Sequence, residues 1–318
     1  MPRPLVSIII PAYNAGAHID VSIESALAQT FSSRTVIVVN DGSTDNTADR
    51  LRAWADPAVH VITQPNLGVA SAVNTGIATS ESEYIGFLDA DDVWLPQKLT
   101  RHVQFLKDNP SVDLTFSWVR VIDAQGQRVR MPCPRWVGPI SFRQLLADYT
   151  IRTMSAVVMR RSSIDEAGPV GTGFVRCMDI DFFLRVALLR PNNIHAIPEV
   201  LTLYRRHSGQ HTEDWRLVRK GFEQVLASMR HRAPEDTAMV ANLALSNMER
   251  YFASVAYEYG DFSEARRLAR QNLASNPGIF VRDFRNWELS AACLATLLLP
   301  RRVLFALERI VGFDHSHQ

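Results

Sequence analysis

Between residues 5 and 88, short apolar runs alternate with longer segments in which apolar residues recur at helical spacing. The runs are rich in β-branched and aromatic residues, which is typical of strands buried on both faces. This order predicts an α/β fold, a mainly parallel sheet sandwiched by helices. Strands are expected at residues 5–10, 35–39, 59–62 and 84–88, with Pro11 ending the first, and helices at 17–29, 48–55 and 69–78.

The pattern continues to about residue 212 and then changes. From residue 213 onward the apolar residues follow long helical periods with no strand signal. We therefore divide the chain into a first domain, residues 1–212, and an all-α C-terminal extension, residues 213–318. In the rest of the first domain, helices are expected at 96–107, 141–147 and 179–189, strands at 112–122, 155–160, 194–197 and 201–205, and a loop at 132–139.

Two parts of the extension have a pattern of their own. Residues 251–277 resemble one tetratricopeptide helix pair, which is too little for a solenoid and favours a helical cap packed on the first domain. Residues 289–311 are apolar and then amphipathic, with Arg301, Arg302 and Arg309. This segment fits either a helix packed on the first domain or an amphipathic helix in peripheral contact with a membrane surface.

The loops that follow the first four strands are expected to meet. Right-handed crossovers place all strand-to-helix loops at one end of a parallel sheet, so residues 11–14, 40–45, 65–68 and 89–92 should line one crevice. Asp89, Asp91 and Asp92 crowd together there, and their like charges repel unless a cation neutralises them. Asp89 and Asp91 can approach one hard divalent ion. A solvated acidic turn before a helix is the alternative for this pattern alone.

Composition narrows the class of protein. The 318 residues are 47% hydrophobic and 21% charged, which indicates a folded chain, and the net charge of +1 gives no reason to expect a nucleic-acid partner. The three scattered cysteines argue against a disulfide framework or a zinc site. The first apolar run is too short for a signal peptide or a span, so a cytoplasmic location is expected, with any membrane contact peripheral and on the inner face.

Six motifs in order carry a family resemblance over residues 5–212. With them the chain resembles the family 2 glycosyltransferases, which are inverting enzymes of the GT-A, Rossmann-like fold. The helical extension lies outside the resemblance. The motifs are VSIIIPAYN (6–14), VIVVNDGSTDNT (36–47), NLGVASAVNTG (66–76), FLDADD (87–92), MDIDFFLR (178–185) and YRRHSG (204–209).

The resemblance implies a nucleotide-sugar site and a metal site. The loop after the first strand would hold the base, and Asp41 would accept a hydrogen bond from the uracil ring. In the D-x-D motif, Asp91 and Asp89 would ligate Mn or Mg, which would bridge the two phosphates. The implied nucleotide-sugar residues are Pro11, Ala12, Tyr13, Asp41, Asn66, Gly68, Asp89, Ala90, Asp91 and His207.

The resemblance also identifies a catalytic residue. Asp179 matches the general base of the family, which takes a proton from the acceptor hydroxyl as it attacks the anomeric carbon. An ordinary helix N-cap is the alternative for Asp179, and His207, Arg205 and Arg206 are either ligand contacts or surface residues. Two positions depart from the family: Val73 stands where many relatives have arginine, and Met178 stands where a glutamate usually precedes the base.

The leading hypothesis is a metal-dependent inverting glycosyltransferase of cell-surface polysaccharide or glycoconjugate synthesis. Its partners would be a nucleotide-diphosphate sugar, expected to be UDP-linked, and a glycan or lipid-linked acceptor. A non-catalytic module that binds sugar nucleotides and a nucleotidyltransferase are the alternatives. Tight UDP binding without transfer would indicate the first, and release of pyrophosphate would indicate the second.

Overall fold

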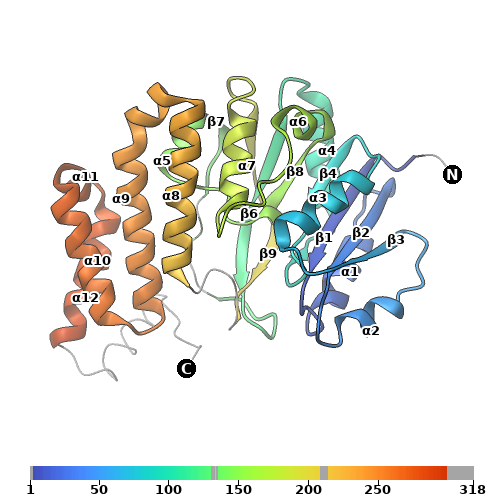
Figure 1. Ribbon diagram of the computed structural model, residues 1–318, viewed down its shortest axis with the longest axis horizontal. Helices are drawn as coiled ribbons and strands as arrows, with labels where there is room; N and C mark the ends of the chain where they lie inside the picture. The colour runs from blue at the N-terminus through green and yellow to red at the C-terminus, as the bar shows by residue number, and fades with distance from the viewer. Residues whose placement is uncertain (1–2, 130–132, 134, 208–213, 299–318) are drawn as a thin grey trace.

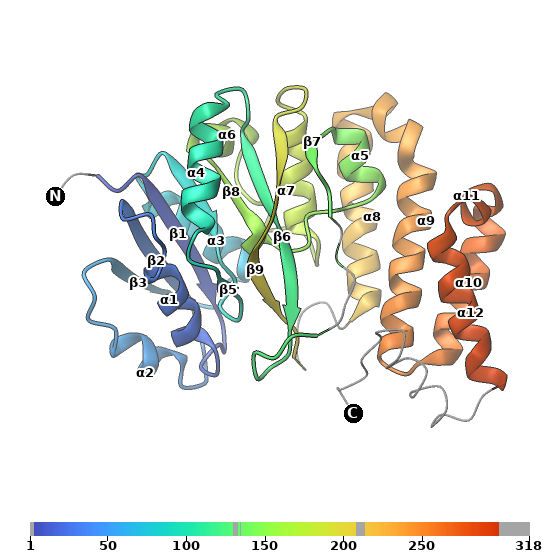
Figure 2. The ribbon, with the colours of Figure 1, turned by 180° about the vertical axis from the view of Figure 1, so that it is seen from behind.

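The computed structural model describes residues 3–129, 133, 135–207 and 214–298. A nine-stranded sheet runs through the middle of the described residues, and five helices of the extension stand beside one another at one side of it (Figure 1). Helices α3, α6 and α7 cover one face of the sheet (Figure 1), and α1 and α4 cover the other (Figure 2).

The sheet has the order β3-β2-β1-β4-β8-β6-β9-β5, with β7 paired to β9. Strands β1 to β4 are parallel, as predicted, but β8 is antiparallel to both of its neighbours, so the second half of the sheet is mixed. The strands are β1 (Val6–Ala12), β2 (Arg34–Asp41), β3 (Val59–Gln64), β4 (Tyr84–Phe87), β5 (Val93–Trp94), β6 (Leu114–Ile122), β7 (Gly138–Ile140), β8 (Val157–Arg160) and β9 (Ile194–Arg205).

The helices separate into those around the sheet and those of the extension. Around the sheet lie α1 (Ile19–Leu27), α2 (Thr47–Arg52), α3 (Val69–Thr79), α4 (Lys98–Asp108), α5 (Phe142–Ala147), the 3-10 turn η1 (Met154–Ala156), α6 (Arg161–Ala167) and α7 (Met178–Ala187). The extension consists of α8 (Trp215–Arg232), α9 (Pro234–Glu258), α10 (Phe262–Ser275), α11 (Pro277–Arg282) and α12 (Phe284–Leu298).

Strand β1 continues through Pro11, where the sequence predicted its end. The carbonyl of Ile9 accepts a hydrogen bond from the N–H of Leu88, so Ile9 faces the β4 side of the strand. Pro11, two residues further on, faces the same side, but β4 pairs with β1 only as far as Phe87. The missing N–H of Pro11 therefore costs no ladder hydrogen bond.

Other differences arise where pairing overrides local pattern. The two short strands predicted at 194–197 and 201–205 form one strand, because a register irregularity opposite Ser117 and Trp118 accommodates Pro198. Strand β7 begins inside the predicted loop 132–139 because residues 138–140 pair with β9. Strand β5 and helix α6 were not predicted.

The largest apolar core runs from the sheet into the extension. It contains Phe182 and Leu184 of α7 together with Phe222 and Leu226 of α8, all of which are buried. A separate apolar cluster joins α8, α9, α10 and α12 and includes Phe252 and Leu268. The extension is thus packed on the first domain through α8 and α9, and the predicted boundary at residue 212 interrupts a continuous core.

The predicted tetratricopeptide-like pair corresponds to the end of α9 and to α10. Gly260 has a positive φ of 76° in the turn between them, and Pro277 begins α11. Within the described residues, no helix has the length and apolar character that spanning a membrane requires. The amphipathic run with Arg301, Arg302 and Arg309 lies outside the described residues.

The contact of α3 with β1 generates the first prediction. A Cβ added at Gly76 would lie 2.5 Å from Cγ2 of Ile9, which is fully buried. Gly76→Ala should therefore lower the free energy of unfolding by about 1–3 kcal/mol, because overpacking outweighs the gain in helix propensity of about 1 kcal/mol. Urea unfolding measures this. Gly278→Ala, which meets no atom within 4 Å, is the control; equal stability of both variants would contradict the prediction.

Candidate active site

The acidic loop after β4 is held by residues of a distant segment. The Asp89 side chain accepts a hydrogen bond of 2.8 Å from the hydroxyl of Thr153, and the Asp89 N–H donates to the hydroxyl of Ser155 at 2.9 Å. Thr153 and Ser155 lie between α5 and β8, where the sequence carries no motif. Polar side chains of the segment 148–155 thus complete a site that motif analysis finds only in part.

Asp92 holds the acidic loop in place by hydrogen bonds to residues outside it. Its side chain is fully buried and accepts hydrogen bonds from the N–H of Arg205 at 2.8 Å and from Thr153 at 3.4 Å. Helix α4 begins only at Lys98, so Asp92 does not cap it. Burial and the neighbouring Asp91 raise the pKa of the Asp92 carboxyl well above its usual value. Asp92 is therefore a structural acid at the end of β9.

Asp91 lies beside two histidines. One of its oxygens is 3.0 Å from Nε2 of His207, and the rings of His207 and His18 are 5.2 Å apart. Burial is the main cause that lowers the pKa of His18, and the cationic Arg205 lowers it further. The structure places His207 of the Y-R-R-H motif beside the D-x-D loop, where the sequence left open a ligand contact or a surface position. It also places His18 there, which the sequence did not indicate.

The acidic cluster fits a divalent cation. Burial, and then the charge of Asp91, raise the pKa of Asp89 to about 6, so the cluster has an energetic cost that a cation would remove. Carboxylate oxygens are the ligands that Mg and Mn prefer. No group of three His, Cys, Asp or Glu residues converges on a metal position in the part of the chain that the structure describes. Two carboxylates cannot fill the coordination shell of such an ion, so an ion held by Asp89 and Asp91 would keep positions for other ligands.

Asp41 organises the neighbouring loop. It is buried at the end of β2 and accepts hydrogen bonds from the side chain of Gln64 at 2.8 Å and from the N–H groups of Leu67 and Gly68 at 2.9 and 2.8 Å. A carboxylate has about four lone-pair sites, so these three donors leave room for one more. Asn66 beside them is exposed.

The loop after β1 completes this end of the sheet. Ala12 is buried and Tyr13 is 45% exposed. Asn14 adopts a positive φ of 50° and accepts a hydrogen bond of 2.8 Å from the N–H of Thr44, which ties the loop after β1 to the loop after β2. Pro11, Ala12, Tyr13 and Asp41 therefore lie at the ends of adjacent strands. Ala90, within the acidic loop, is nearly buried.

Asp179 lies in the first turn of α7. Cys177, with a positive φ of 62°, occupies the N-cap position, so Asp179 is not the cap. Its side chain accepts a hydrogen bond of 3.3 Å from the hydroxyl of Tyr149. Burial raises the pKa of the Asp179 carboxyl. Asp181, by contrast, is buried in an ion pair of 2.8 Å with Arg185.

The two arginines of the Y-R-R-H motif have protein partners. Arg205 is buried and donates to the backbone carbonyls of Asp91, Asp123 and Ala124 at 2.7, 3.1 and 3.1 Å. Arg206 forms an ion pair of 2.7 Å with Glu258 at the end of α9. Both arginines thus have a structural role at the end of β9.

The departures from the family pattern differ in their surroundings. Val73 lies on α3 and is fully buried in the apolar core. Met178 is the first residue of α7 and packs against the same core. The neighbouring Asn74 pairs with both backbone groups of Val170, accepting at 2.9 Å and donating at 2.8 Å. This pair ties α3 to the loop that leads into α7.

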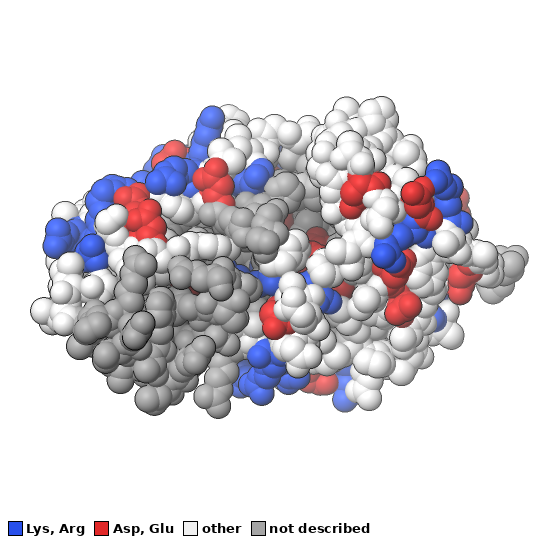
Figure 3. Space-filling model, turned by 90° about the horizontal axis from the view of Figure 1, so that it is seen from below, with Lys and Arg blue, Asp and Glu red and all other residues white. Residues whose placement is uncertain are grey.

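Among the described residues, the surface at this end of the molecule carries charged side chains of both signs. Seen from below in Figure 3, Lys and Arg side chains lie interspersed with Asp and Glu. This mixture agrees with the small net charge of the chain.

Comparison with known proteins identifies the family. The family model described as "Glycosyl transferase family 2" matches residues 7–168, half of the chain. The chain therefore belongs to the family 2 glycosyltransferases and is a glycosyltransferase, which confirms the resemblance and the enzyme class predicted from the motifs.

Two relatives are similar in sequence to part of this chain. A UDP-Glc:alpha-D-GlcNAc-diphosphoundecaprenol beta-1,3-glucosyltransferase, WfgD of Escherichia coli, is 30% identical over 61% of this chain and 73% of its own length. An uncharacterized glycosyltransferase of Rickettsia conorii is 31% identical over 65% of this chain. The match spans only 35% of that protein, about a third of its length.

Solved structures share the fold over nearly the whole chain. S. aureus TarS residues 1–349 in complex with UDP-GlcNAc aligns with a TM-score of 0.62 and 14% identity, over 91% of this chain and 90% of that one. The mannosyltransferase PcManGT from Pyrobaculum calidifontis, in complex with GDP-Man and Mn2+, aligns with a TM-score of 0.57 and 20% identity, over 93% and 87%. The predicted GT-A fold with a helical C-terminal region is confirmed.

The role of Arg205 generates the second prediction. Arg205→Lys keeps the charge but loses the planar fork that reaches three carbonyls. The free energy of unfolding should fall by about 1–3 kcal/mol, since buried acceptors lose their donors. Chemical denaturation measures this. Arg120→Lys, at an exposed position of the adjacent strand β6, is the control, and equal losses in the two variants would contradict the prediction.

Proposed function

We propose that the chain transfers a sugar from a UDP-sugar to an acceptor hydroxyl with inversion, with Asp179 as the general base. One observation supports this most strongly. The segment 149–153 donates hydrogen bonds to both acidic groups, from Tyr149 to Asp179 and from Thr153 to Asp89. The negative charge of Asp179 also contributes to the raised pKa of Asp89. The base and the acidic loop therefore belong to one site.

The proposed reaction uses Asp179 as its general base. The acceptor oxygen attacks the anomeric carbon while its proton passes to the Asp179 carboxylate, and the bond between the anomeric carbon and the diphosphate oxygen breaks. The products are the inverted glycoside and the nucleoside diphosphate. Burial makes Asp179 a stronger base than an exposed aspartate, which suits proton transfer near neutral pH.

A divalent ion, Mn or Mg, would be held by Asp89 and Asp91 and would stabilise negative charge on the leaving diphosphate. The acidic cluster favours such an ion, and the presence of Mn2+ in PcManGT supports the proposal. His207, beside Asp91, would contact the same phosphate region. Asp89, Ala90 and Asp91 are thus proposed to handle the leaving group, apart from the base.

Uracil is the proposed base of the donor nucleotide. Asp41 has one acceptor site beyond its three hydrogen bonds, which suits the ring N–H of uracil, and Pro11, Ala12 and Tyr13 end at the same edge of the sheet. Asn66 and Gly68 lie in the loop that Asp41 holds. The UDP-GlcNAc complex of TarS and the UDP-Glc named for WfgD support this choice.

The acceptor is proposed to be a glycan or lipid-linked sugar of cell-surface polysaccharide or glycoconjugate synthesis. The diphosphoundecaprenol acceptor named for WfgD supports the lipid-linked form. Such an acceptor would bring the chain to the inner face of the membrane, with peripheral contact through the C-terminal tail.

The third prediction concerns catalysis. With UDP-sugars, GDP-sugars, Mn and Mg, the purified chain should release a nucleoside diphosphate rather than pyrophosphate, and only with a UDP-sugar and an acceptor. Asp179→Asn should lower kcat by about 10²–10⁴-fold because the base is lost. Asp91→Asn should weaken Mn-dependent UDP binding, measured by calorimetry. Asp108→Asn, on the exposed end of α4, is the control. Equal turnover of wild type and Asp179→Asn would contradict the proposal.

The fourth prediction is a pH dependence. Burial raises the pKa of Asp179, while the hydrogen bond from Tyr149 favours the carboxylate and lowers the pKa. Tyr149→Phe removes that bond, so the pKa should rise further. Because the base acts only when deprotonated, the acid limb of the kcat profile should move to higher pH, with the alkaline limb unchanged. An acid limb that stays in place or moves down would contradict the role of Tyr149.

A further inference from the structure

We propose that the C-terminal helices position the segment 148–153 for catalysis, with Asn247 of α9 and Arg285 of α12 as positioning residues. This inference rests on the proposed function, because it concerns how Tyr149 is presented to Asp179. It gives the helical extension a direct role in transfer rather than in stability alone.

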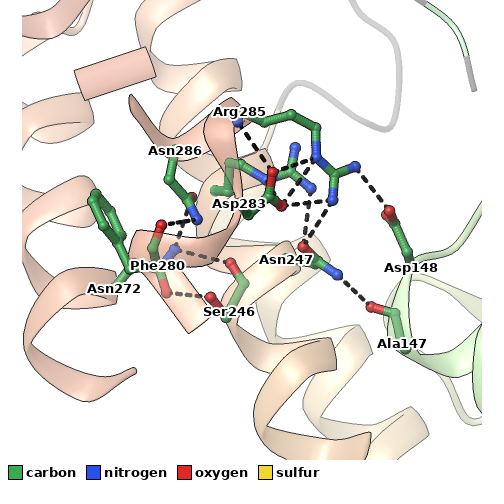
Figure 4. Close-up of polar contacts among 10 residues, drawn as sticks. Ala147, Asp148, Ser246, Asn247, Asn272, Phe280, Asp283, Arg285 and Asn286 are labelled. Atoms are coloured by element: carbon green, nitrogen blue, oxygen red, sulfur yellow. Dashed lines mark hydrogen bonds and ion pairs between the residues drawn. The ribbon is translucent and has the colours of Figure 1, made fainter. Parts of the chain in front are cut away.

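Two side chains of the extension, Asn247 and Arg285, form hydrogen bonds with residues 147 and 148 at the start of this segment, and we call these two contacts the grip (Figure 4). Asn247 donates its side-chain N–H to the carbonyl of Ala147 at 2.8 Å, at the end of α5. Arg285 donates Nη1 to the carboxylate of Asp148 at 2.8 Å. The backbone of residue 147 and the side chain of residue 148 are thus both bound from outside the first domain, directly before Tyr149.

The gripping residues are themselves held in place. Arg285 forms three further side-chain hydrogen bonds with Asp283, from Nε to Oδ1 and Oδ2 at 2.9 and 3.0 Å and from Nη2 to Oδ2 at 2.6 Å. The Asn247 oxygen accepts a hydrogen bond of 3.1 Å from Arg250. Asn247 is 8% exposed, so its bond to Ala147 has little competition from water. The Asn247 contact is therefore shielded from water, whereas the side chains of Arg285 and Asp148 are 39% and 44% exposed and Arg285 is held by Asp283.

A buried polar network fixes the helices that carry the grip. Ser246 and Asn272 exchange two hydrogen bonds, 2.8 Å between side chains and 3.0 Å to the Ser246 carbonyl, and Asn272 also donates to Asn286 at 3.3 Å (Figure 4). All three residues are almost fully buried. Buried polar groups favour the one arrangement in which every member is paired. The network thus sets α9, α10 and α12 in register.

The grip acts on geometry that tolerates little displacement. The bond from Tyr149 to Asp179 is 3.3 Å, already at the long end of hydrogen-bond distances, so a shift of the segment would break it. Thr153, at the other end of the segment, bonds to Asp89. Misplacement on this scale affects proton transfer more than ground-state binding of the donor.

The fifth prediction tests the grip by kinetics. Arg285→Gln and Asp148→Asn, which remove one contact from opposite sides, and Asn247→Ala should each lower kcat about tenfold or more with the donor KM within about twofold. The acid limb of kcat should move to higher pH, as in Tyr149→Phe. In a Tyr149→Phe background, Arg285→Gln should have no further effect, because both act through the same bond.

The matched control breaks another link between α5 and α9, the two helices that the contact of Asn247 with Ala147 joins. Arg143 of α5 and Asp236 of α9 form an exposed ion pair of 2.6 Å at the far end of α5. Arg143→Gln should leave kcat and the acid limb unchanged. If it lowers kcat as much as Arg285→Gln does, or if Arg285→Gln keeps wild-type kcat and acid limb, the positioning role is overturned while the proposed function stands.

Amide hydrogen exchange gives a readout that needs no turnover. Exchange across residues 148–153 should become about tenfold faster in Arg285→Gln and in Asn247→Ala, but not in Arg143→Gln, because the grip restrains this segment locally. A wild-type chain that transfers no sugar would contradict the proposed function, and exchange alone would then decide the inference. Unchanged exchange in both grip variants would overturn it.

Discussion

Three carboxylates within four residues must be kept in one place while two of them stay available to a ligand. The structure separates these tasks. Asp92 is buried and bonded to the N–H of Arg205, whereas Asp91 faces His207 and Asp89 accepts from Thr153. The buried acid thus holds the turn through its hydrogen bonds. Without the Asp92 side chain, the loop would lose its hydrogen bonds to the N–H of Arg205 and to Thr153.

The elements that surround this loop are explained by the same requirement. Strand β9 ends at this loop with Arg205, whose guanidinium donates to three carbonyls, and His207 follows two residues later. Helix α9 meets both sides of the site, through Glu258 at Arg206 and through Asn247 at Ala147. Helix α9 therefore restrains the chain both just after β9, at Arg206, and just before Tyr149, at Ala147.

The sequence predicts the first half of the fold well because local pattern and pairing agree there. Parallel strands β1, β2 and β4 are buried runs, edge strand β3 is partly exposed, and the loops after β1, β2 and β4 contain motifs. The prediction is weaker where pairing is nonlocal. Two-residue strand β5 was not predicted. Strand β8 was predicted at 155–160, but its antiparallel pairing with β4 and β6 depends on partners far along the chain and has no local signal.

The candidate site divides in the same way. Asp41, Asp89, Asp91 and Asp179 stand in motifs, so their positions follow from chain order. Tyr149, Thr153 and His18 do not, because they reach the site only through the path of the chain between α5 and β8 and through the start of α1. A tyrosine or threonine outside a motif has no sequence signal until its partner is known.

The apolar core that passes from α7 into α8 limits how this fold can be recombined. Phe182 and Leu184 belong to the same buried core as Phe222 and Leu226, which lie beyond the last family motif. A glycosyltransferase domain that ended at residue 212 would expose that face to water, so exchange of C-terminal regions between family members requires a replacement with an equivalent apolar surface. The extension contributes to the core of the first domain, so a chimaera of two family members should not be joined at residue 212.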